Sequence, residues 1–356
     1  PVEWEISEIR KFLKIMHGQS QHEVECKNGT YPILGTGGII GNANSYLYDK
    51  PSILIGRKGT IDKPMFIDTP FWTIDTLFYS KIFDNVNIKY LFYIFKIINW
   101  LKYDDSTGVP SLSANTIENI KIIVSTNNLE QQKIAEILDC ATRQVELQEQ
   151  LVDKLKVQKK ALMQKLLTPQ PDWQKLKLKN IINFYNGYSF KSETYVKNGA
   201  FYVITISNVK DDGFILQEDT STIEKIPTDI RDYQILRKGD ILISMTGNVG
   251  RVCKVECDNC LLNQRVGKIE VKKEFDKNFI FYSLQSYSFV EKMKLLAQGA
   301  AQDNMSVKDI NNYIICLPKN KEIQSNISNL LSNIDKRIEL QQKLLEQYKL
   351  RQKSLM

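Results

Sequence analysis

Three cysteines in the second half of the chain have the spacing of a metal or cluster site. The pattern Cys253-x3-Cys257-x2-Cys260 matches the iron–sulfur motif of radical S-adenosylmethionine enzymes, and three thiolates can also begin a zinc site. However, the residues around the first two cysteines alternate in polarity, as in a strand, and Asp258–Asn259 is typical of a hairpin turn. The first half has no matching cysteines, so a structural role is favoured over a metal or cluster.

Other combinations of reactive residues give weaker signals. Glu270-x-Lys272, with Asp258 upstream, is weakly similar to a metal-dependent nuclease core, but Glu-x-Lys is common in exposed strands. The two histidines, His17 and His22, give little support for nucleophilic catalysis. The sequence has no Gly-x4-Gly-Lys-Ser/Thr phosphate loop, and it lacks the Pro-Pro pair of the adenine methyltransferase motif. We therefore expect no catalytic residue, metal or bound cofactor in this chain.

Composition sets broad limits on the class of protein. The 356 residues are 42% hydrophobic and 25% charged, which is enough apolar material for a folded core, and the length suggests two domains or two domains with an appendage. No stretch of about 18 apolar residues occurs, so no membrane span is expected. Six cysteines are too few for a secreted disulfide scaffold, and no signal peptide is visible, so we expect a cytoplasmic protein. The net charge of +7 fits a polyanionic partner but does not prove one.

An internal repeat is the main signal in the sequence. Two segments with helical periodicity, roughly Leu129–Leu167 and Lys321–Met356, match at an offset of 193 residues. Between Val145 and Met163, 8 of 19 positions are identical at this offset. Each repeat opens with a tryptophan, Trp4 or Trp173, and this pair is 169 residues apart, so the second globular part is longer by 24 residues. The chain is thus predicted to contain a globular segment followed by a long helix, twice.

The repeat predicts four segments: a domain over 1–127, a long helix over 128–168, a second domain over 169–319 and a second long helix over 320–356. The Thr168–Pro171 stretch ends the first helix, because proline cannot continue one. Within the domains, short strands bounded by turns alternate with helices, which predicts mixed α/β domains with small sheets and an α+β class. The expected strands are Pro32–Leu34, Ser52–Ile55, Tyr202–Ile206 and Asp240–Ser244, and the expected helices are Asn87–Asn99 and Asn278–Lys292.

Both long helices carry a seam of mostly apolar residues in alternating steps of four and three, as in coiled coils. The first seam is Ile134, Leu138, Ala141, Val145, Gln148, Val152, Leu155, Lys159, Leu162 and Leu166. The second is Ile327, Leu331, Ile334, Ile338, Gln341, Leu345, Tyr348, Gln352 and Leu355. Each seam has two polar positions, Gln148 with Lys159 and Gln341 with Gln352. Such positions can fix the register of a helix pair when they meet polar partners.

These seams predict that the two helices pack on each other as an antiparallel coiled coil, with one domain at each end. About 38 residues at roughly 1.5 Å each give a spacer of about 57 Å. The alternative is that each helix packs only on its own domain, which would leave most of a long apolar seam in water. A pair of related domains joined in this way has approximate two-fold symmetry, which matches a DNA duplex with two half-sites.

Several duplicated stretches carry a resemblance to a known family. They are the helix endings Gln158–Thr168 and Arg351–Met356, the strand-like stretches from Gly108 through Val124 and Asn304–Leu317, and the segments Pro32–Gly38 and Ile53–Gly59. Together and in this order, over essentially the whole chain, they resemble the specificity subunit of type I restriction–modification enzymes.

The resemblance implies two target recognition domains, each reading one half of a split double-stranded DNA sequence, with the paired helices as a ruler. It implies a non-catalytic chain that assembles with two modification subunits, which bind S-adenosylmethionine and methylate adenine. It also implies restriction subunits that use ATP and Mg²⁺. The alternative from another class is a coiled-coil adaptor whose duplicated domains bind protein or peptide.

Candidate DNA contacts in the first domain lie in two loops, because Arg, Lys, Asn and Gln side chains suit base edges and phosphates. Gly35–Asn44 is expected to be a flexible, glycine-rich loop that carries Asn42 and Asn44, although a plain strand-connecting turn is equally open. A second loop follows an apolar strand and is either a DNA contact or a solvated turn. It carries Arg57, Lys58 and Lys63.

The second domain has three corresponding stretches. Met245–Arg251 contributes Thr246, Asn248 and Arg251 as candidate DNA contacts. The Asn263–Arg265 stretch contributes Gln264 and Arg265, although its place beside a strand also suits structural hydrogen bonds. The Gln298–Asn304 loop corresponds to Gly108–Ser111 and contributes Gln302 and Asn304. Because the loops differ while the framework is shared, the two domains are expected to read different half-sites.

Overall fold

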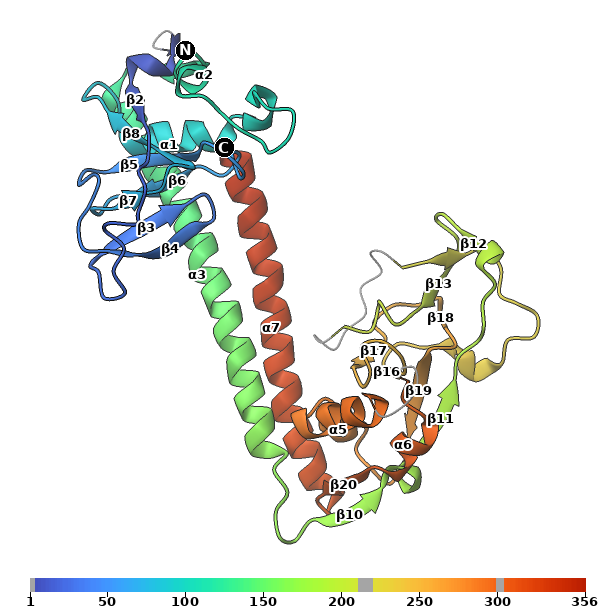
Figure 1. Cartoon of the computed structure of the whole chain (residues 1–356). Coiled ribbons are helices and arrows are strands. Elements are labelled where there is room, and N and C mark those ends of the chain that lie inside the picture. The colour runs from blue at the N-terminus through green and yellow to red at the C-terminus, as the bar shows by residue number, and fades with distance from the viewer. Residues whose placement is uncertain (1–3, 211–219, 299–303) are drawn as a thin grey trace. The chain divides into compact units, whose positions relative to one another are not determined.

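The computed structural model describes residues 4–210, 220–298 and 304–356 (Figure 1). The chain divides into two compact units, Pro1–Gln150 with Lys343–Met356, and Leu151–Gln342. Each unit holds one globular α/β domain and a segment of each of two long helices, α3 (Asn128–Leu166) and α7 (Lys321–Leu355). Within the described residues, no helix is long and apolar enough to cross a membrane.

The domain of the first unit contains three small sheets. The first is an antiparallel sheet with the strand order β2-β8-β5-β6. The second has the order β4-β3-β7, and its strands β3 and β7 are parallel. The third is the pair of β1 with β9. The elements are β1 (Trp4–Glu8), β2 (Leu13–Met16), β3 (Tyr31–Gly35), β4 (Gly38–Ala43), β5 (Ser52–Gly56), β6 (Met65–Ile67), β7 (Trp72–Thr73), β8 (Leu77–Ile82), α1 (Ile88–Ile97), α2 (Ala114–Glu118) and β9 (Lys121–Ser125).

The domain of the second unit repeats this topology. Its four-stranded sheet has the order β11-β19-β16-β17. Its second sheet has five strands in the order β12-β14-β13-β18-β15, and β13 and β18 are the parallel pair. The third sheet is the pair of β10 with β20. The elements are β10 (Gln174–Lys177), β11 (Ile182–Asn186), β12 (Tyr195–Val196), β13 (Phe201–Ile204), β14 (Thr222–Ile223), β15 (Ile235–Leu236), β16 (Ile241–Ser244), β17 (Val252–Lys254), β18 (Cys260–Leu262), β19 (Val266–Val271), α4 (Lys277–Leu284), α5 (Tyr287–Gln298), α6 (Val307–Asn312) and β20 (Ile314–Leu317).

Even the strand register repeats between the two domains. Glu5 lies opposite Val124 in the β1–β9 pair, and their counterparts Gln174 and Leu317 lie opposite each other in the β10–β20 pair. The sequence repeat is therefore also a repeat of topology, and the extra strands of the second domain are β12 and β15, at the two edges of its five-stranded sheet.

The predicted helix over Asn278–Lys292 is wrong as a single helix, because the structure breaks it into α4 and α5. The side chain of Gln285, which caps the end of α4, donates to the carbonyl of Val252 at 3.0 Å. The hydroxyl of Ser286 donates to the carbonyl of Ser283 at 2.6 Å. The first bond ties the break to β17, and the second satisfies a carbonyl group at the end of α4, so the chain can turn there and start a new helix.

The stretches from Gly108 through Val124 and Asn304–Leu317 were expected to be strand-like, and each instead contains a short helix before its strand. Ser113 caps α2 by accepting the backbone N–H of Thr116 at 3.0 Å, and Ser306 with Asp309 forms a reciprocal capping box at the start of α6. The strands begin only afterwards, at Lys121 in β9 and Ile314 in β20.

Each domain is clamped to the start of the long helix that follows it by a buried glutamine. The side chain of Gln131 accepts the backbone N–H of Asn87 at 2.7 Å and donates to the carbonyl of Ser125 at 2.8 Å. In the second unit, Gln324 makes the same two bonds with Asp276 at 3.0 Å and Pro318 at 2.8 Å. Both glutamines are 1% exposed, so each clamp joins three segments without competition from water.

Replacing Gln324 by alanine is expected to lower the free energy of unfolding by about 2 kcal/mol, because it leaves the Asp276 N–H and the Pro318 carbonyl buried without this partner. The measurement is urea unfolding followed by circular dichroism. Gln347→Ala, at an exposed position of the same helix, is the matched control and should change the free energy by less than about 0.5 kcal/mol. Equal effects of the two variants would contradict the role of the clamp.

Within each unit the segments of α3 and α7 run antiparallel and side by side (Figure 1). In the first unit, the side-chain amide of Gln352 donates to the hydroxyl of Thr142 at 2.8 Å, and Lys349 pairs with Glu149 at 3.1 Å. In the second unit, Lys159 pairs with Asp335 at 2.6 Å. Lys159 and Gln352, the second polar positions of the two predicted seams, are thus equivalent positions that meet different partners.

Most predicted seam positions are shielded from solvent. Leu138, Val145, Gln148, Val152 and Leu155 are buried on α3, as are Leu331, Ile338 and Leu345 on α7. Ile134, Leu162, Ile327, Ile334, Gln341 and Tyr348 are half-buried. The prediction for Leu355 is wrong, because it is 43% exposed at the end of α7, where Met356 packs against the first core instead.

A partly buried lysine lies where β17 rests on α4. The ammonium group of Lys254 is 4.1 Å from the ring centroid of Phe281, and it donates to the side-chain carbonyl of Asn278 at 2.8 Å. Burial is the main cause that lowers the pKa of Lys254 to about 8, and Lys277 lowers it further, whereas Asp335, Glu256 and Asp276 raise it. Below about pH 8, where Lys254 is charged in the folded protein, its burial therefore lowers the stability of the fold.

Lys254→Met is expected to change how stability depends on alkaline pH. Because the pKa of Lys254 is lower in the folded state than its ordinary value of 10.5, the unfolded state binds more protons between about pH 8 and 10. The wild-type protein should therefore gain about 1–2 kcal/mol relative to the variant over this range. Urea unfolding at pH 7, 8.5 and 10 measures the difference, with the exposed Lys238→Met as control. If the difference in free energy of unfolding between wild type and Lys254→Met does not change with pH, the lowered pKa of Lys254 is contradicted.

Candidate nucleic-acid interface

In the first unit, the turn after β5 is joined to the loop before α2 through main-chain atoms. Leu112 donates its N–H to the carbonyl of Arg57 at 2.9 Å, Gly59 donates to Pro110 at 2.8 Å, and Lys58 forms a β-bridge with Ser111. Gly59 has a φ of +95°, a backbone conformation that other residues rarely adopt. Two loops far apart in sequence therefore form one rigid surface.

The second unit builds the same surface from different residues. Met305 donates its N–H to the carbonyl of Met245 at 2.9 Å, and Thr246 forms a β-bridge with Asn304. Met245 also donates to the carbonyl of Arg265 at 3.1 Å, so a third loop lies alongside. The structure thus brings together Thr246, Arg265 and Asn304, three of the residues that the sequence predicted as DNA contacts.

The side chains of the first surface are mostly open to solvent. Arg57, Lys58 and Lys63 are exposed, and one guanidinium nitrogen of Arg57 donates to the carbonyl of Asp75 at 3.3 Å. That bond restrains the Arg57 side chain while leaving other donors of its guanidinium group available. Exposed basic donors on joined loops suit contacts with phosphate oxygens or guanine edges.

Of the two possibilities left open for Gly35–Asn44, the flexible loop is wrong and the strand-connecting turn is confirmed. The segment forms a hairpin in which Gly35 of β3 pairs with Gly38 of β4, while Pro32 pairs with Asn42. The glycines serve the tight turn instead, where Gly38 has a φ of +111°.

Consequently, Asn42 and Asn44 are exposed but lie away from the turn, near the base of the hairpin. The turn itself approaches the interface, since a Cβ on Gly59 would lie 3.8 Å from the hydroxyl of Thr36. Sequence reasoning missed Thr36 and Ser111 as members of this surface, because only non-local pairing brings them there.

In the second unit, a hollow of about 300 Å³ lies between the 245–251 loop and α5. Asn248 and Arg251 line it together with Lys294 of α5, which the sequence did not single out. Gln264 is exposed beside Arg265, and its N–H donates to the carbonyl of Tyr188 at 2.8 Å. Gln302 lies outside the described residues.

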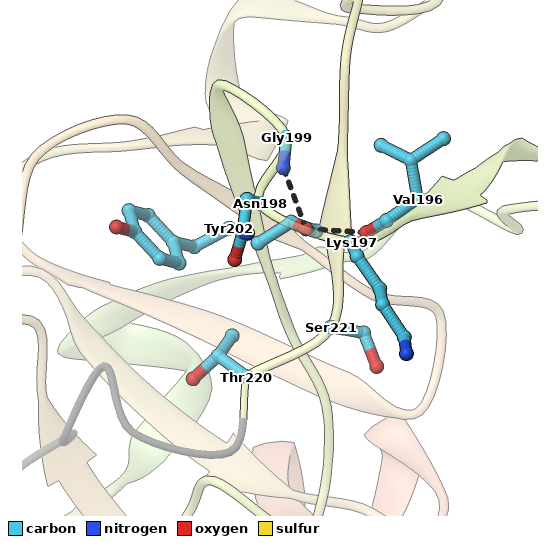
Figure 2. A pocket seen from close by; sticks show the side chains of 8 residues that line it. Val196, Lys197, Asn198, Gly199, Tyr202, Thr220 and Ser221 are labelled. Atoms are coloured by element: carbon cyan, nitrogen blue, oxygen red, sulfur yellow. Dashed lines mark hydrogen bonds between the residues drawn. The ribbon is translucent and has the colours of Figure 1, made fainter.

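A larger hollow of about 590 Å³ lies elsewhere in this domain, at the ends of β12, β13 and β14 (Figure 2). One of its lining residues, Thr222, joins two others, because its hydroxyl accepts the N–H of Gly199 at 2.9 Å and donates to the carbonyl of Val196 at 2.6 Å. Polar side chains and one cation, Lys197, line it. Its lining residue Thr220 directly follows residues 211–219, which are outside the described part of the chain, and none of its lining residues is a predicted DNA contact.

The three spaced cysteines belong to the structure of the second domain. Cys253 is buried in β17, and the sulfurs of Cys257 and Cys260 are joined as a disulfide in the same small apolar core. The turn at Asp258–Asn259 is present, with Asn259 at a φ of +57°, but it links strands of two different sheets rather than a hairpin. Among the described residues, no three His, Cys, Asp or Glu side chains gather in a way that suits a metal ion.

The Glu270-x-Lys272 pattern has structural partners. The Glu270 carboxylate accepts the side-chain amide of Asn183 at 3.1 Å and the hydroxyl of Tyr185 at 2.9 Å, and these bonds lower its pKa. The ammonium group of Lys272 donates to two backbone carbonyls at 3.3 and 3.1 Å. Both side chains therefore stabilise the sheet and its neighbouring turn.

Two copies of one α/β fold, each presenting joined loops that carry basic side chains, are the arrangement of a duplicated nucleic-acid recognition protein. The family model of the type I restriction modification DNA specificity domain matches residues 1–157 and 170–350. The chain belongs to this family, and it is a non-catalytic, DNA-binding specificity subunit of a type I restriction–modification system.

Known relatives agree with this placement. The chain is 28% identical to the type I restriction enzyme MjaVIII specificity subunit of Methanocaldococcus jannaschii, over all of this chain and 92% of the relative. It is 25% identical to the EcoBI specificity subunit of Escherichia coli over 48% of this chain and 35% of that protein. Its fold is similar to the crystal structure of the S subunit from M. genitalium, with a TM-score of 0.72, 16% identity, and coverage of 99% and 94% of the two chains.

Proposed function

We propose that this subunit reads a bipartite target in double-stranded DNA, one half-site through each recognition domain. The observation that carries the proposal is the repeated loop junction, Lys58 with Ser111 and Thr246 with Asn304. The backbone geometry is the same in both domains, whereas the side chains presented are different. A shared framework with different donors is what reading two different half-sites requires.

The two long helices act in this proposal as an antiparallel coiled-coil spacer that fixes the distance between the half-sites. The polar and ionic contacts between helix segments within each unit support antiparallel pairing. The 39 residues of α3 correspond to about 58 Å of helix. We expect the half-sites to lie on one face of the duplex, about 10 bp from centre to centre.

The chemistry of the complex is assigned to other chains. Two modification subunits would bind S-adenosylmethionine and methylate adenine, and restriction subunits would use ATP and Mg²⁺. We propose that this chain binds no cofactor itself and works in the cytoplasm, where it delivers these subunits to their DNA site.

Sequencing-based mapping of methylated adenines tests the proposal directly. The full chain is expressed together with its modification subunits, and the genomic DNA of the cells is compared with that of cells lacking only this chain. We expect one split motif, methylated in both strands and absent without the chain. A contiguous motif, or methylation that does not depend on this chain, would refute the bipartite reading.

A further inference from the structure

One buried carboxylate in the second unit joins three elements. Asp335 of α7 is 8% exposed, and it accepts the hydroxyl of Tyr282 from α4 at 2.8 Å. It also pairs with the ammonium group of Lys159 from α3 at 2.6 Å. Lys159 is itself only 16% exposed and lies 5.7 Å from the ring centroid of Tyr282. The recognition domain therefore meets both long helices at a single charged site.

The first unit has an equivalent site with different chemistry. At the offset of 193, Asp335 corresponds to Thr142 and Lys159 to Gln352, and these two also bond to each other, at 2.8 Å. The tyrosine is present as Tyr93, whose hydroxyl donates to Asp139 at 2.6 Å and to Thr142 at 3.2 Å. In the second junction, the residue pair at these positions is thus an ion pair, whereas in the first it is an amide–hydroxyl pair. The carboxylate of the first junction, Asp139, lies one helical turn earlier and pairs with Lys89 at 3.4 Å.

The charged junction connects to the recognition loop over a short path. Tyr282 lies one turn before Gln285 on α4, and the Gln285 amide donates to the carbonyl of Val252 at 3.0 Å. Val252 directly follows Arg251, which lines the hollow of the candidate interface. Strand β17, which directly follows the 245–251 loop, is therefore tied to the end of α4, and Tyr282 ties α4 to α7 by a hydrogen bond that has a required direction.

We propose that Lys159, Asp335 and Tyr282 are positioning residues for DNA recognition, because they fix the orientation of the second recognition domain on the paired helix segments. This inference rests on the proposed bipartite reading. Apolar seam contacts permit small rotations of one element on another, whereas a buried ion pair with a tyrosine hydroxyl is satisfied in only one arrangement. Loss of the site should therefore change which DNA is bound as well as the stability of the fold.

The first variant for the test is Asp335→Thr, which leaves Lys159 without its carboxylate. The rescue variant is K159Q/S332D/D335T, which copies the residues of the first junction, Gln352, Asp139 and Thr142, into the second. Tyr282→Phe removes only a hydroxyl and serves if Asp335→Thr does not fold. Lys160→Gln, at the exposed position beside Lys159, is the matched control.

Binding is measured with the purified full chain. The probes are 40-bp duplexes selected by the wild-type chain from a randomised pool, each with matched versions in which one half-site is scrambled. Arg57→Ala, in the first domain, shows which half-site belongs to which domain. The half-site that this variant still discriminates from its scrambled version is assigned to the second domain. Unfolding midpoints and far-ultraviolet circular dichroism confirm that each variant is folded at the assay temperature.

We expect Asp335→Thr to weaken binding to the intact duplex at least tenfold and to reduce discrimination at the half-site of the second domain only. Tyr282→Phe should weaken binding about threefold to tenfold, Lys160→Gln should have no effect, and the triple variant should regain both affinity and discrimination. Folded Asp335→Thr and Tyr282→Phe proteins that both bind like wild type would overturn the inference. If the wild-type chain selects no split duplex at all, the proposed function fails instead.

Discussion

Deleting one heptad from each long helix, Leu147–Asp153 of α3 and Leu340–Glu346 of α7, is expected to move the preferred DNA spacer to a shorter length. Binding to the original spacer should fall at least a hundredfold. Seven residues shorten a helix by about 10.5 Å, roughly three base pairs of duplex at 3.4 Å each. The deletion preserves the alternating seam steps and both polar junctions, so the helices can still pair.

The measurement is competition binding against duplexes whose spacers range from five base pairs shorter to five longer than the original. The control is Leu147→Gln with Leu340→Gln, which changes exposed side chains of the same heptads without changing their length. This control should keep the original preference. A heptad deletion that also keeps it would show that the helices are not the ruler.

Arg57→Ala is expected to weaken binding at the half-site of the first domain by about 1–3 kcal/mol, or roughly 5- to 150-fold, if its guanidinium contacts a guanine edge in bidentate fashion. The bond from Arg57 to the carbonyl of Asp75 restrains the side chain at the loop, which reduces the conformational freedom that is lost on binding. Discrimination at the other half-site should be unchanged.

Arg10→Ala is the control for this substitution, because Arg10 is a half-exposed arginine of the same domain that pairs with Glu8 at 2.9 Å. Affinity should be measured from about 50 to 200 mM salt. A base contact predicts lost sequence discrimination, whereas a phosphate contact predicts a uniform loss and a smaller salt dependence. Wild-type affinity of Arg57→Ala at both half-sites would remove this residue from the interface.

Features with local causes could be predicted from the sequence. The long helices were visible because their periodicity repeats over many turns, and α3 and α7 begin within one residue of the predicted Leu129 and Lys321. The repeat was visible because it preserves identity at a constant offset. The break between α4 and α5 was not, since the Gln285 amide is satisfied by Val252, a residue 33 positions away in the chain.

The residues of the candidate site divide in the same way, into those that local sequence features predict and those that only the folded structure brings to the site. Arg57, Lys58, Thr246 and Arg265 could be selected by residue type beside a predicted strand, and the structure places them on the joined loops. Thr36 and Lys294 reach these surfaces only through pairing between distant segments. Asp335 was missed for another reason: it neighbours the seam position Ile334, and only the packed structure shows that it meets Lys159.

The joined loops also bear on how such a protein can acquire a new target. The bonds that hold Arg57 to Leu112 and Met245 to Met305 use main-chain atoms alone. Side chains at the adjoining exposed positions can therefore be replaced without disturbing the scaffold that presents them. Retargeting by a handful of substitutions, or by transplanting a single loop between homologues, is consequently compatible with an intact fold, and new specificities can arise without prior gains in stability.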